Sequence, residues 1–246
     1  MHLLDIKQYD KVKHLFEFFY NFAWLIDIME TKGVGKIYTH DASDYKAAYI
    51  ETPFSDFYMA GTFNQDFFDD IIHHIIHDIM PKDEDKLGFF YTSDHVWRKH
   101  LDEVLLPFED LEYGSHLIRK YHQIDLTKYQ AFKKHIPLLP AKYHMVFDKA
   151  DVSFRIYDGD KEICHCQDFG QGAGIMDLDV FTDEAYRHQG LAQISCVALI
   201  DYCLSNDIVP LWGCWDKNIK SCRLANKIGF ECIAEEQVNF ANFINN

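Results

Sequence analysis

The chain has 246 residues, of which 48% are hydrophobic and 26% are charged. This balance is typical of a globular protein with a real core, and it excludes disordered and collagen-like chains. The 39 acidic residues outnumber the 24 Lys and Arg residues, so the formal net charge is −15. Nucleic acid is therefore a poor partner, because neutralising phosphates requires clustered basic residues. A cationic small molecule suits such a field better.

Three features indicate a cytoplasmic protein. Asp5 interrupts the N-terminal segment, which lacks the apolar core and cleavage site of a secretory signal. The most apolar stretch, residues 18–29, contains Asn21 and Asp27 and is shorter than the ~20 apolar residues of a membrane span. The seven Cys residues are odd in number and form no C-x-x-C pair, as in a reducing compartment. We expect no membrane segment and no bound metal.

The first half of the chain alternates helix-like and strand-like segments. Its expected elements are helices over 7–29, 66–80 and 94–106, and strands over 36–39, 45–51 and 57–60. In residues 66–80 the apolar positions recur at helical spacing and form one stripe. His73 and His77 lie off that stripe and could clamp a metal, but this helix offers no clear third ligand. A solvated polar face is the better interpretation.

The second half continues the alternation, with a domain boundary near residue 110. The expected elements are an extended segment 113–124, a short helix from Asp125 or Thr127 to His135, strands 152–157, 162–167, 175–182, 207–213 and one or two within 230–240, and helices ending near Leu204 and Gly229. No sequence repeat or Gly/Ser linker appears. We therefore expect a layered α/β fold with domains 1–110 and 111–246.

The turn between the strand 175–182 and the next helix has the pattern R-x-x-G-x-A, formed by Arg187, Gly190 and Ala192. A helix N-terminus presents unpaired N–H groups and a partial positive charge. Small residues let the backbone approach a diphosphate, and an arginine adds a charged donor. The segment therefore suits a pyrophosphate, although an ordinary strand-to-helix turn can have the same pattern.

Together with its surroundings, this turn resembles the GNAT superfamily of acyl-CoA N-acyltransferases. The resemblance covers residues 112–246 and rests on the strand 176–182, the loop 186–192, and Asn218 with the Lys227-to-Phe230 ending of the next helix. The whole layout resembles bacterial GNAT-type acetyltransferases with an extra N-terminal α/β half. The resemblance implies a mixed, mainly antiparallel sheet with a splayed central strand pair, flanking helices, and acetyl-CoA as co-substrate.

The resemblance also implies a set of cofactor-binding residues. Those along the pantetheine arm and thioester are Val180, Phe181 and Thr182, those at the pyrophosphate are Arg187, His188, Gln189, Gly190, Leu191 and Ala192, and those near the reactive end are Asn218 and Ser221. Residues 1–110 are expected to shape the acceptor site without binding CoA.

Catalysis by such a protein needs an amine that has lost its proton before it attacks the thioester. Asp177 and Asp179 are the candidate bases, with His165 as a weaker one. Ala225 stands where many relatives carry a tyrosine acid. The expected activity is acetyl transfer to a small-molecule or peptide amine, and the sequence does not identify that acceptor. A non-catalytic CoA-binding protein and a metal-dependent protein are the alternatives.

Overall fold

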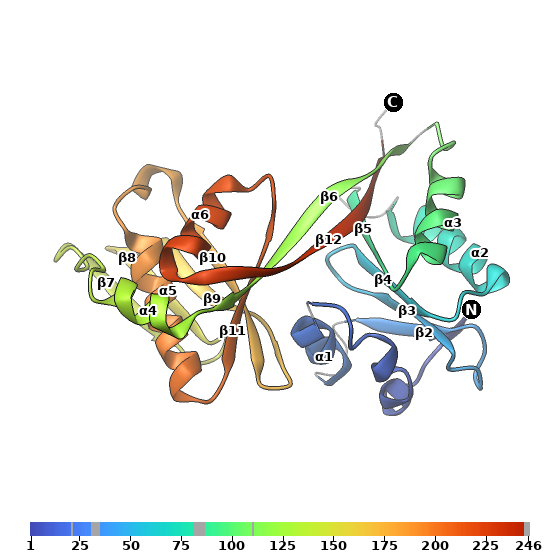
Figure 1. The fold of residues 1–246 in the computed structure, drawn as a ribbon, viewed down its shortest axis with the longest axis horizontal. Coiled ribbons are helices and arrows are strands. Elements are labelled where there is room, and N and C mark those ends of the chain that lie inside the picture. Colours follow the sequence, from blue (N-terminus) through green and yellow to red (C-terminus); the bar gives the residue numbers. More distant parts are fainter. Residues whose placement is uncertain (21, 31–34, 81–86, 110, 244–246) are drawn as a thin grey trace. The chain divides into compact units, whose positions relative to one another are not determined.

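The computed structural model describes residues 1–20, 22–30, 35–80, 87–109 and 111–243 (Figure 1). The chain divides into two compact units. Unit 1 comprises Met1–Ile118 and Glu236–Asn246, and unit 2 comprises Arg119–Glu235. Two long strands, β6 (Leu111–Ile124) and β12 (Phe230–Phe243), have residues in both units. The boundary expected near residue 110 had instead placed all of 111–246 in one domain.

The sheet of unit 1 has a meander followed by a crossover. Its strands are β1 (His2–Leu3), β2 (Lys36–Thr39), β3 (Ala47–Glu51), β4 (Asp56–Gly61), β5 (Leu87–Thr92) and the last part of β12, in that spatial order. The pairs from β1 to β4 are antiparallel, β4 is parallel to β5, and β5 is antiparallel to β12. The sequence analysis found β2, β3, β4 and part of β12, and it missed β1 and β5.

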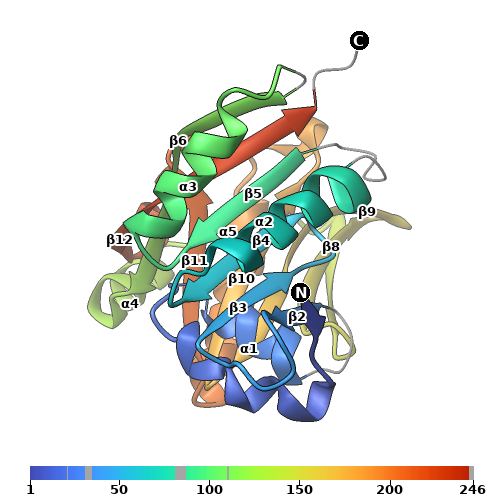
Figure 2. The same ribbon diagram turned by 90° about the vertical axis from the view of Figure 1, so that its right-hand side faces the viewer.

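Helices cover both faces of this sheet. On one face lie α2 (Gln65–His74), which continues as a π-helical turn over Ile75–Ile79, and α3 (His95–Leu105), as Figure 2 shows. The expected apolar stripe is confirmed, since most of it is buried in a core shared with strand residues. The buried stripe residues are Phe67, Phe68, Ile71, Ile72, Ile75 and Ile76. Pro81, expected to end this helix, lies outside the described residues.

The first helix expected in unit 1 is wrong in its extent. Residues 7–29 instead form 3-10 turns over Ile6–Lys11 and Lys13–Leu15, and α1 (Phe22–Glu30) begins only later. Phe19, between these elements, packs edge-on against Tyr58 of β4 with ring centroids 5.3 Å apart. These segments therefore cover the sheet face opposite α2. Among the described residues, no helix combines the length and apolarity that crossing a membrane requires.

The sheet of unit 2 has the same plan. Its spatial order is β6, β11 (Val209–Trp215), β10 (Ile175–Thr182), β9 (Lys161–Gly172), β8 (Ser153–Asp158) and β7 (Tyr143–Asp148). The pairs from β7 to β10 are antiparallel, β10 is parallel to β11, and β11 is antiparallel to β6. The strand expected over 175–182 is confirmed, whereas β7 was missed.

Three helices complete unit 2: α4 (Leu126–Lys133), α5 (Leu191–Ser205) and α6 (Ile219–Ile228). Asp125 caps α4 through the N–H groups of Thr127 and Lys128, and Gly229 ends α6 with a φ of 114°. The helices pack on one face of the sheet around a core that includes Met176 and Leu178 of β10. Their intervening neighbours, among them Asp177 and Asp179, therefore belong to the opposite face.

The two halves of the chain share one topology, although their sequences show no repeat. The order β2-β3-β4-α2-β5-α3-β6 recurs as β8-β9-β10-α5-β11-α6-β12. In each series the third and fourth strands are parallel neighbours, and a helix connects them along the chain. The last strand of each series pairs with the fourth strand of the other, β6 with β11 and β12 with β5. Each compact unit therefore contains a strand segment from the other series.

Candidate functional site

The central strands of unit 2 diverge at Asp177. β10 pairs with β11 only over Ile175 to Asp177, opposite Val209 to Leu211. Beyond that point β10 continues to Thr182 beside β9, while β11 continues to Trp215 beside β6. The expected splayed strand pair is thus present. The edge of β10 that faces β11 has backbone groups without strand partners there, and an extended ligand can pair with such an edge.

The loop after β10 leads to a helix N-terminus without a side-chain cap. Asp183 caps a short 3-10 turn over Glu184–Tyr186 by accepting from the Ala185 N–H. Gly190 is the N-cap of α5, with a φ of 80° and no side chain to accept from the first-turn amides. These amides, at Leu191, Ala192 and Gln193, therefore lack the partner that a Ser or Asp cap provides. An anion placed there would satisfy them.

Only glycine suits position 190. A Cβ there would lie 2.5 Å from Cγ of Pro137, and the backbone is left-handed. The strain and the overlap both disfavour a side chain. Pro137, in the segment that precedes β7, therefore lies close to Gly190.

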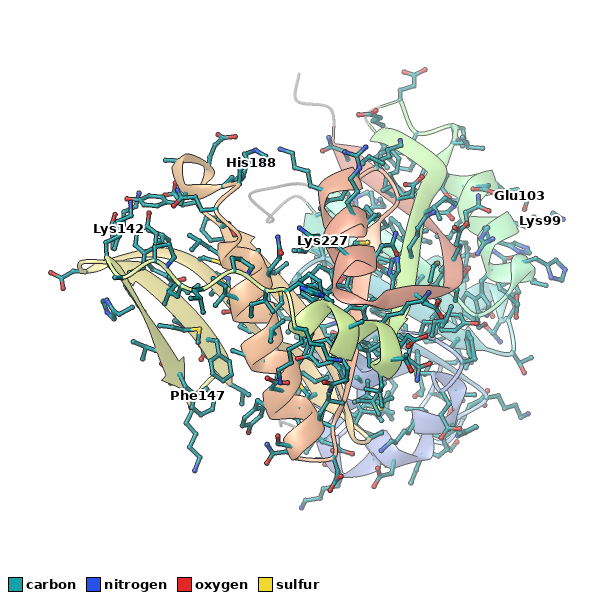
Figure 3. All side chains as sticks on the ribbon, turned by 60° about the vertical axis from the view of Figure 1, so that its left-hand side comes forward. Lys99, Glu103, Lys142, Phe147, His188 and Lys227 are labelled. Atoms are coloured by element: carbon teal, nitrogen blue, oxygen red, sulfur yellow. The ribbon has the colours of Figure 1, made fainter. Side chains whose placement is uncertain are left out.

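A cavity of about 580 Å³ opens between this loop and α6. The residues expected to bind the cofactor line it, with the exception of Gln189; the lining comprises Val180, Phe181, Thr182, Tyr186, Arg187, His188, Gly190, Leu191, Ala192, Gln193, Asn218, Lys220, Ser221, Leu224 and Lys227. The side chain of Gln189 instead accepts a hydrogen bond from Tyr143 at 3.0 Å. Figure 3 shows His188 on the loop and Lys227 on α6, the two elements that border the cavity.

The basic side chains of this cavity contrast with the net charge of the chain. Arg187 donates to Glu184 at 2.8 Å and to the Thr182 carbonyl at 3.3 Å. Lys220 and Lys227 extend the basic lining along α6, and sequence reasoning missed both. Their spacing of seven residues, with Leu224 between them, places them on one helical face and could have identified them. The cavity can therefore hold an elongated anion.

On α6 the two expected cofactor residues also have structural roles. Asn218 is the N-cap, and its side-chain oxygen accepts from the Ser221 N–H at 3.2 Å. Ser221 accepts from the indole N–H of Trp212 at 3.0 Å. Ala225, one turn further on, is fully buried in the core and does not line the cavity. Helix α6 thus supplies no acid at position 225, where many relatives carry a tyrosine.

Asp177 and Asp179 differ sharply in their surroundings. Asp177 is 8% exposed, and burial raises its pKa to about 7, opposed by the charge of Arg119. It does not line the cavity, and it lies where β10 and β11 begin to diverge. Asp179 is half-exposed and accepts from Gln167 at 3.2 Å. Of the two carboxylates, Asp179 is the one that an incoming molecule can reach.

His165 joins Asp179 to a second carboxylate. Its Nδ1 lies 2.6 Å from Glu162 and its Nε2 lies 3.6 Å from Asp179. The nearby carboxylates of Asp179 and Glu162 raise the pKa of His165, against the effect of burial.

Unit 1 has a similar arrangement at His74, whose Nδ1 lies 3.1 Å from Asp78 and whose Nε2 lies 3.0 Å from Glu51. The ring of His73, on α2, lies 4.6 Å from the ring of His77, in the π-helical turn that follows. Within the part of the chain that the structure describes, no group of three or more His, Cys, Asp or Glu residues could hold a metal ion.

Comparison with known proteins matches part of the chain to one family. Residues 141–238 match the family model of GNAT acetyltransferases. The matched segment contains β10, the loop before α5, β11 and α6, the elements that form the cavity.

Whole-chain relatives match both units. An uncharacterised N-acetyltransferase of Bacillus subtilis (strain 168), YdfB, is 25% identical over 97% of each chain. A GCN5-related N-acetyltransferase-like protein from Streptococcus suis 89/1591 is 17% identical, with a TM-score of 0.68 over 97% of this chain and 99% of that one. A tandem GNAT protein from the clavulanic acid biosynthesis pathway is 8% identical, with a TM-score of 0.63 over 100% of this chain and 98% of that one. The structural matches show a common fold.

Proposed function

Because this chain belongs to the GNAT superfamily of acetyltransferases, we propose that it transfers the acetyl group of acetyl-CoA to a primary amine. The acceptor is a small molecule or a peptide. The observation that carries this proposal is the cavity at the N-terminus of α5, bordered by the open edge of β10 and by the basic face of α6. All seven cysteines are free, in keeping with a protein of the reducing cytoplasm.

The diphosphate and the pantetheine arm of acetyl-CoA suit different parts of the cavity. The diphosphate suits the uncapped amides of Leu191 to Gln193, with Arg187 and Lys227 as nearby cations. The pantetheine arm suits the β10 edge at Val180 to Thr182, where β11 has diverged. The thioester would then lie near the point of divergence.

The chemical step requires little beyond position and proton removal. Holding amine and thioester in line supplies several kcal/mol of the barrier, and a carboxylate or imidazole on β9 or β10 takes the proton of the ammonium. No acid is needed for the leaving group, because a thiol of pKa ~8.5 departs as a thiolate. Burial of Ala225 in the core therefore does not rule out turnover.

A non-catalytic CoA-binding protein is the second candidate, and the same alanine favours it. Such a protein would retain the cavity and bind acetyl-CoA without consuming it. Incubation of the protein with acetyl-CoA and a panel of amines separates the two functions, since only an enzyme releases free CoA in proportion to acetylated product.

Binding itself is tested by Ala192→Asp. This residue is in the first turn of α5, where a carboxylate favours the helix by about 0.3–1 kcal/mol but repels a diphosphate. Calorimetry should show loss of acetyl-CoA affinity. Because Ala192 packs partly against an apolar cluster, the melting temperature of each variant is measured as well. Ala192→Asn, equal in size and uncharged, should keep most of the affinity. If the wild type and both variants bind acetyl-CoA equally well, the diphosphate does not bind at the start of α5.

A further inference from the structure

One face of the β8–β9–β10 sheet carries a connected set of charged side chains. It is the face opposite α5, because the alternate residues of β10 pack into the α5 core. Opposite one another across the strands lie Arg155 of β8, His165 of β9 and Phe181 of β10. The ring of Phe181 stacks on His165 with centroids 5.4 Å apart.

A β-bulge brings Glu162 into this set. Residues three apart on a regular strand point to opposite faces. The register between β8 and β9 shifts between Ile156 and Tyr157, which leaves Ile163 as an extra residue. Glu162 therefore lies on the face of His165, with its two oxygens at 2.6 Å from the imidazole and 2.9 Å from Arg155.

In this set of side chains the negative charges outnumber the positive ones around Asp179. Arg155 is paired with both Asp151 and Glu162. Among the described residues, Asp179 contacts the neutral Gln167 amide and the imidazole of His165, and it is 45% exposed. With His165 neutral, the three carboxylates exceed the single arginine by two charges. One further positive charge, on the imidazole or on a ligand, is favourable there.

This face also adjoins the open edge of β10. Asp179 immediately precedes Val180, the first cavity residue of this strand, and follows the last residue pair with β11 by two positions. A thioester held along β10 would thus be approached from the face that carries Asp179 and Phe181. The half-exposed ring of Phe181 offers an apolar surface beside the carboxylate.

From this placement, and resting on the proposed acetyl transfer, we propose that the acceptor is a cationic primary amine whose ammonium group binds Asp179 beside Phe181 and gives its proton to His165. Glu162 is a positioning residue that orients the imidazole. The proton leaves the ammonium nitrogen and forms an N–H bond at Nε2 of His165, either through the Asp179 carboxylate or directly. The neutral amine then attacks the thioester carbonyl, the C–S bond breaks to release CoA thiolate, and the amide nitrogen loses its second proton to solvent.

The charged groups around His165 fix the direction of its pH response. They are Glu162 on β9, Asp179 on β10 and Arg155 on β8. The two carboxylates raise the pKa of His165, so the imidazole becomes free to accept a proton only as pH rises through that raised value. The rate should rise with pH accordingly. Glu162→Gln should move the rise to lower pH, whereas a rise caused by deprotonation of the amine in solution would not move.

The first experiment needs no turnover. NMR of histidine-labelled full-length protein follows the titration of His165, assigned through His165→Gln, with propylammonium chloride or an equal concentration of sodium chloride. An ammonium at Asp179 should lower the pKa of His165 beyond the effect of salt, and Asp179→Asn should abolish the difference. Equal titration in both salts would overturn the proposed ammonium site.

The second experiment measures release of CoA thiol with propylamine, phenethylamine and spermidine across pH. His165→Gln should lower kcat by roughly 10²–10⁴-fold, and Glu162→Gln should shift the rising limb to lower pH. Asp151→Asn removes a carboxylate that pairs with Arg155 but leaves both carboxylates that contact the imidazole. This variant should shift the rising limb of the pH profile far less than Glu162→Gln does. Wild-type rates in His165→Gln would refute the proton transfer. If acetyl-CoA binds but no amine is acetylated, the proposed function fails, and the NMR titration still decides the ammonium site.

Discussion

The carboxyl group of Asp177 is buried where the two central strands diverge. Its pKa is about 7 in the folded chain against a usual 3.8. The folded state therefore binds this proton more tightly than the unfolded chain does. The resulting stability is present below pH 3.8 and is lost as pH rises to about 7.

The prediction for Asp177→Asn follows from this loss of stability as pH rises. The free energy of unfolding of the wild type should fall by a few kcal/mol between pH 4 and 8 on account of this group, at about 1.4 kcal/mol per pKa unit. The variant should lose that part of the decline. Urea unfolding at several pH values measures both proteins, and parallel curves would contradict the prediction.

Ala225 stands where the family pattern favours a tyrosine, whereas the packing around it leaves no room for one. The sequence places Ala225 where many relatives carry a tyrosine acid. Because Ala225 is fully buried in the core, Ala225→Tyr should instead cost about 1–3 kcal/mol by overpacking, with no gain in rate. Leu224→Tyr, at a residue that lines the cavity, should be tolerated better. Urea unfolding and CoA release compare the two, and a faster Ala225→Tyr enzyme would refute this account.

At the scale of elements, the start of α5 depends on the segment before β7. Gly190→Ala should cost roughly 1–2 kcal/mol for the left-handed backbone alone, and more for the overlap with Pro137 at 2.5 Å. Acetyl-CoA affinity should fall too, since the first-turn amides move.

Pro137→Ala removes the overlap but not the backbone strain. The double variant should therefore recover part of the melting temperature lost by Gly190→Ala. Strict additivity of the two changes in a double-mutant cycle would show that Pro137 does not restrict this loop.

At the scale of the whole molecule, the two units share a topology, but unit 1 does not reproduce the site of unit 2. In unit 1 only residues 62–64 connect β4 to α2, and the Asn64 side chain accepts from the Phe67 N–H at 2.9 Å. Asp66 adds a negative charge to that first turn. Strands β4 and β5 remain paired as far as Met59 and Thr92. Unit 1 thus lacks the uncapped helix start and the divergence that unit 2 provides.

We therefore predict one acetyl-CoA per chain. Calorimetric titration should give a stoichiometry near one, and Ala192→Asp should remove all of the binding rather than half. A stoichiometry of two would show that unit 1 has a site of its own.

A role for the first half in shaping the acceptor site also stays a prediction. If it holds, the isolated fragment 112–246 should not acetylate the same acceptor at the full rate. The buried residues Val238 and Ala241 of β12 belong to unit 1, so the fragment's solubility must be checked first. A soluble fragment with the full rate would refute the role.

The sequence by itself determined the local elements around the cavity: the strand 175–182, the glycine at the start of α5, and α6 between Asn218 and Gly229. Caps, left-handed glycines and hydrophobic periodicity are encoded within a few neighbouring residues. The exposed edge strand β7 shows no such periodicity, and it was missed.

Only the tertiary structure decided which distant residues meet. The pairing of β6 with β11 joins residues such as His122 and Trp212, 90 positions apart. The grouping of Glu162, His165 and Asp179 depends on a bulge that shifts the strand register. The burial of Ala225 depends on how α6 packs against the sheet. Long-range pairing and packing are collective, since each contact is fixed by many others, and no short stretch of sequence specifies them.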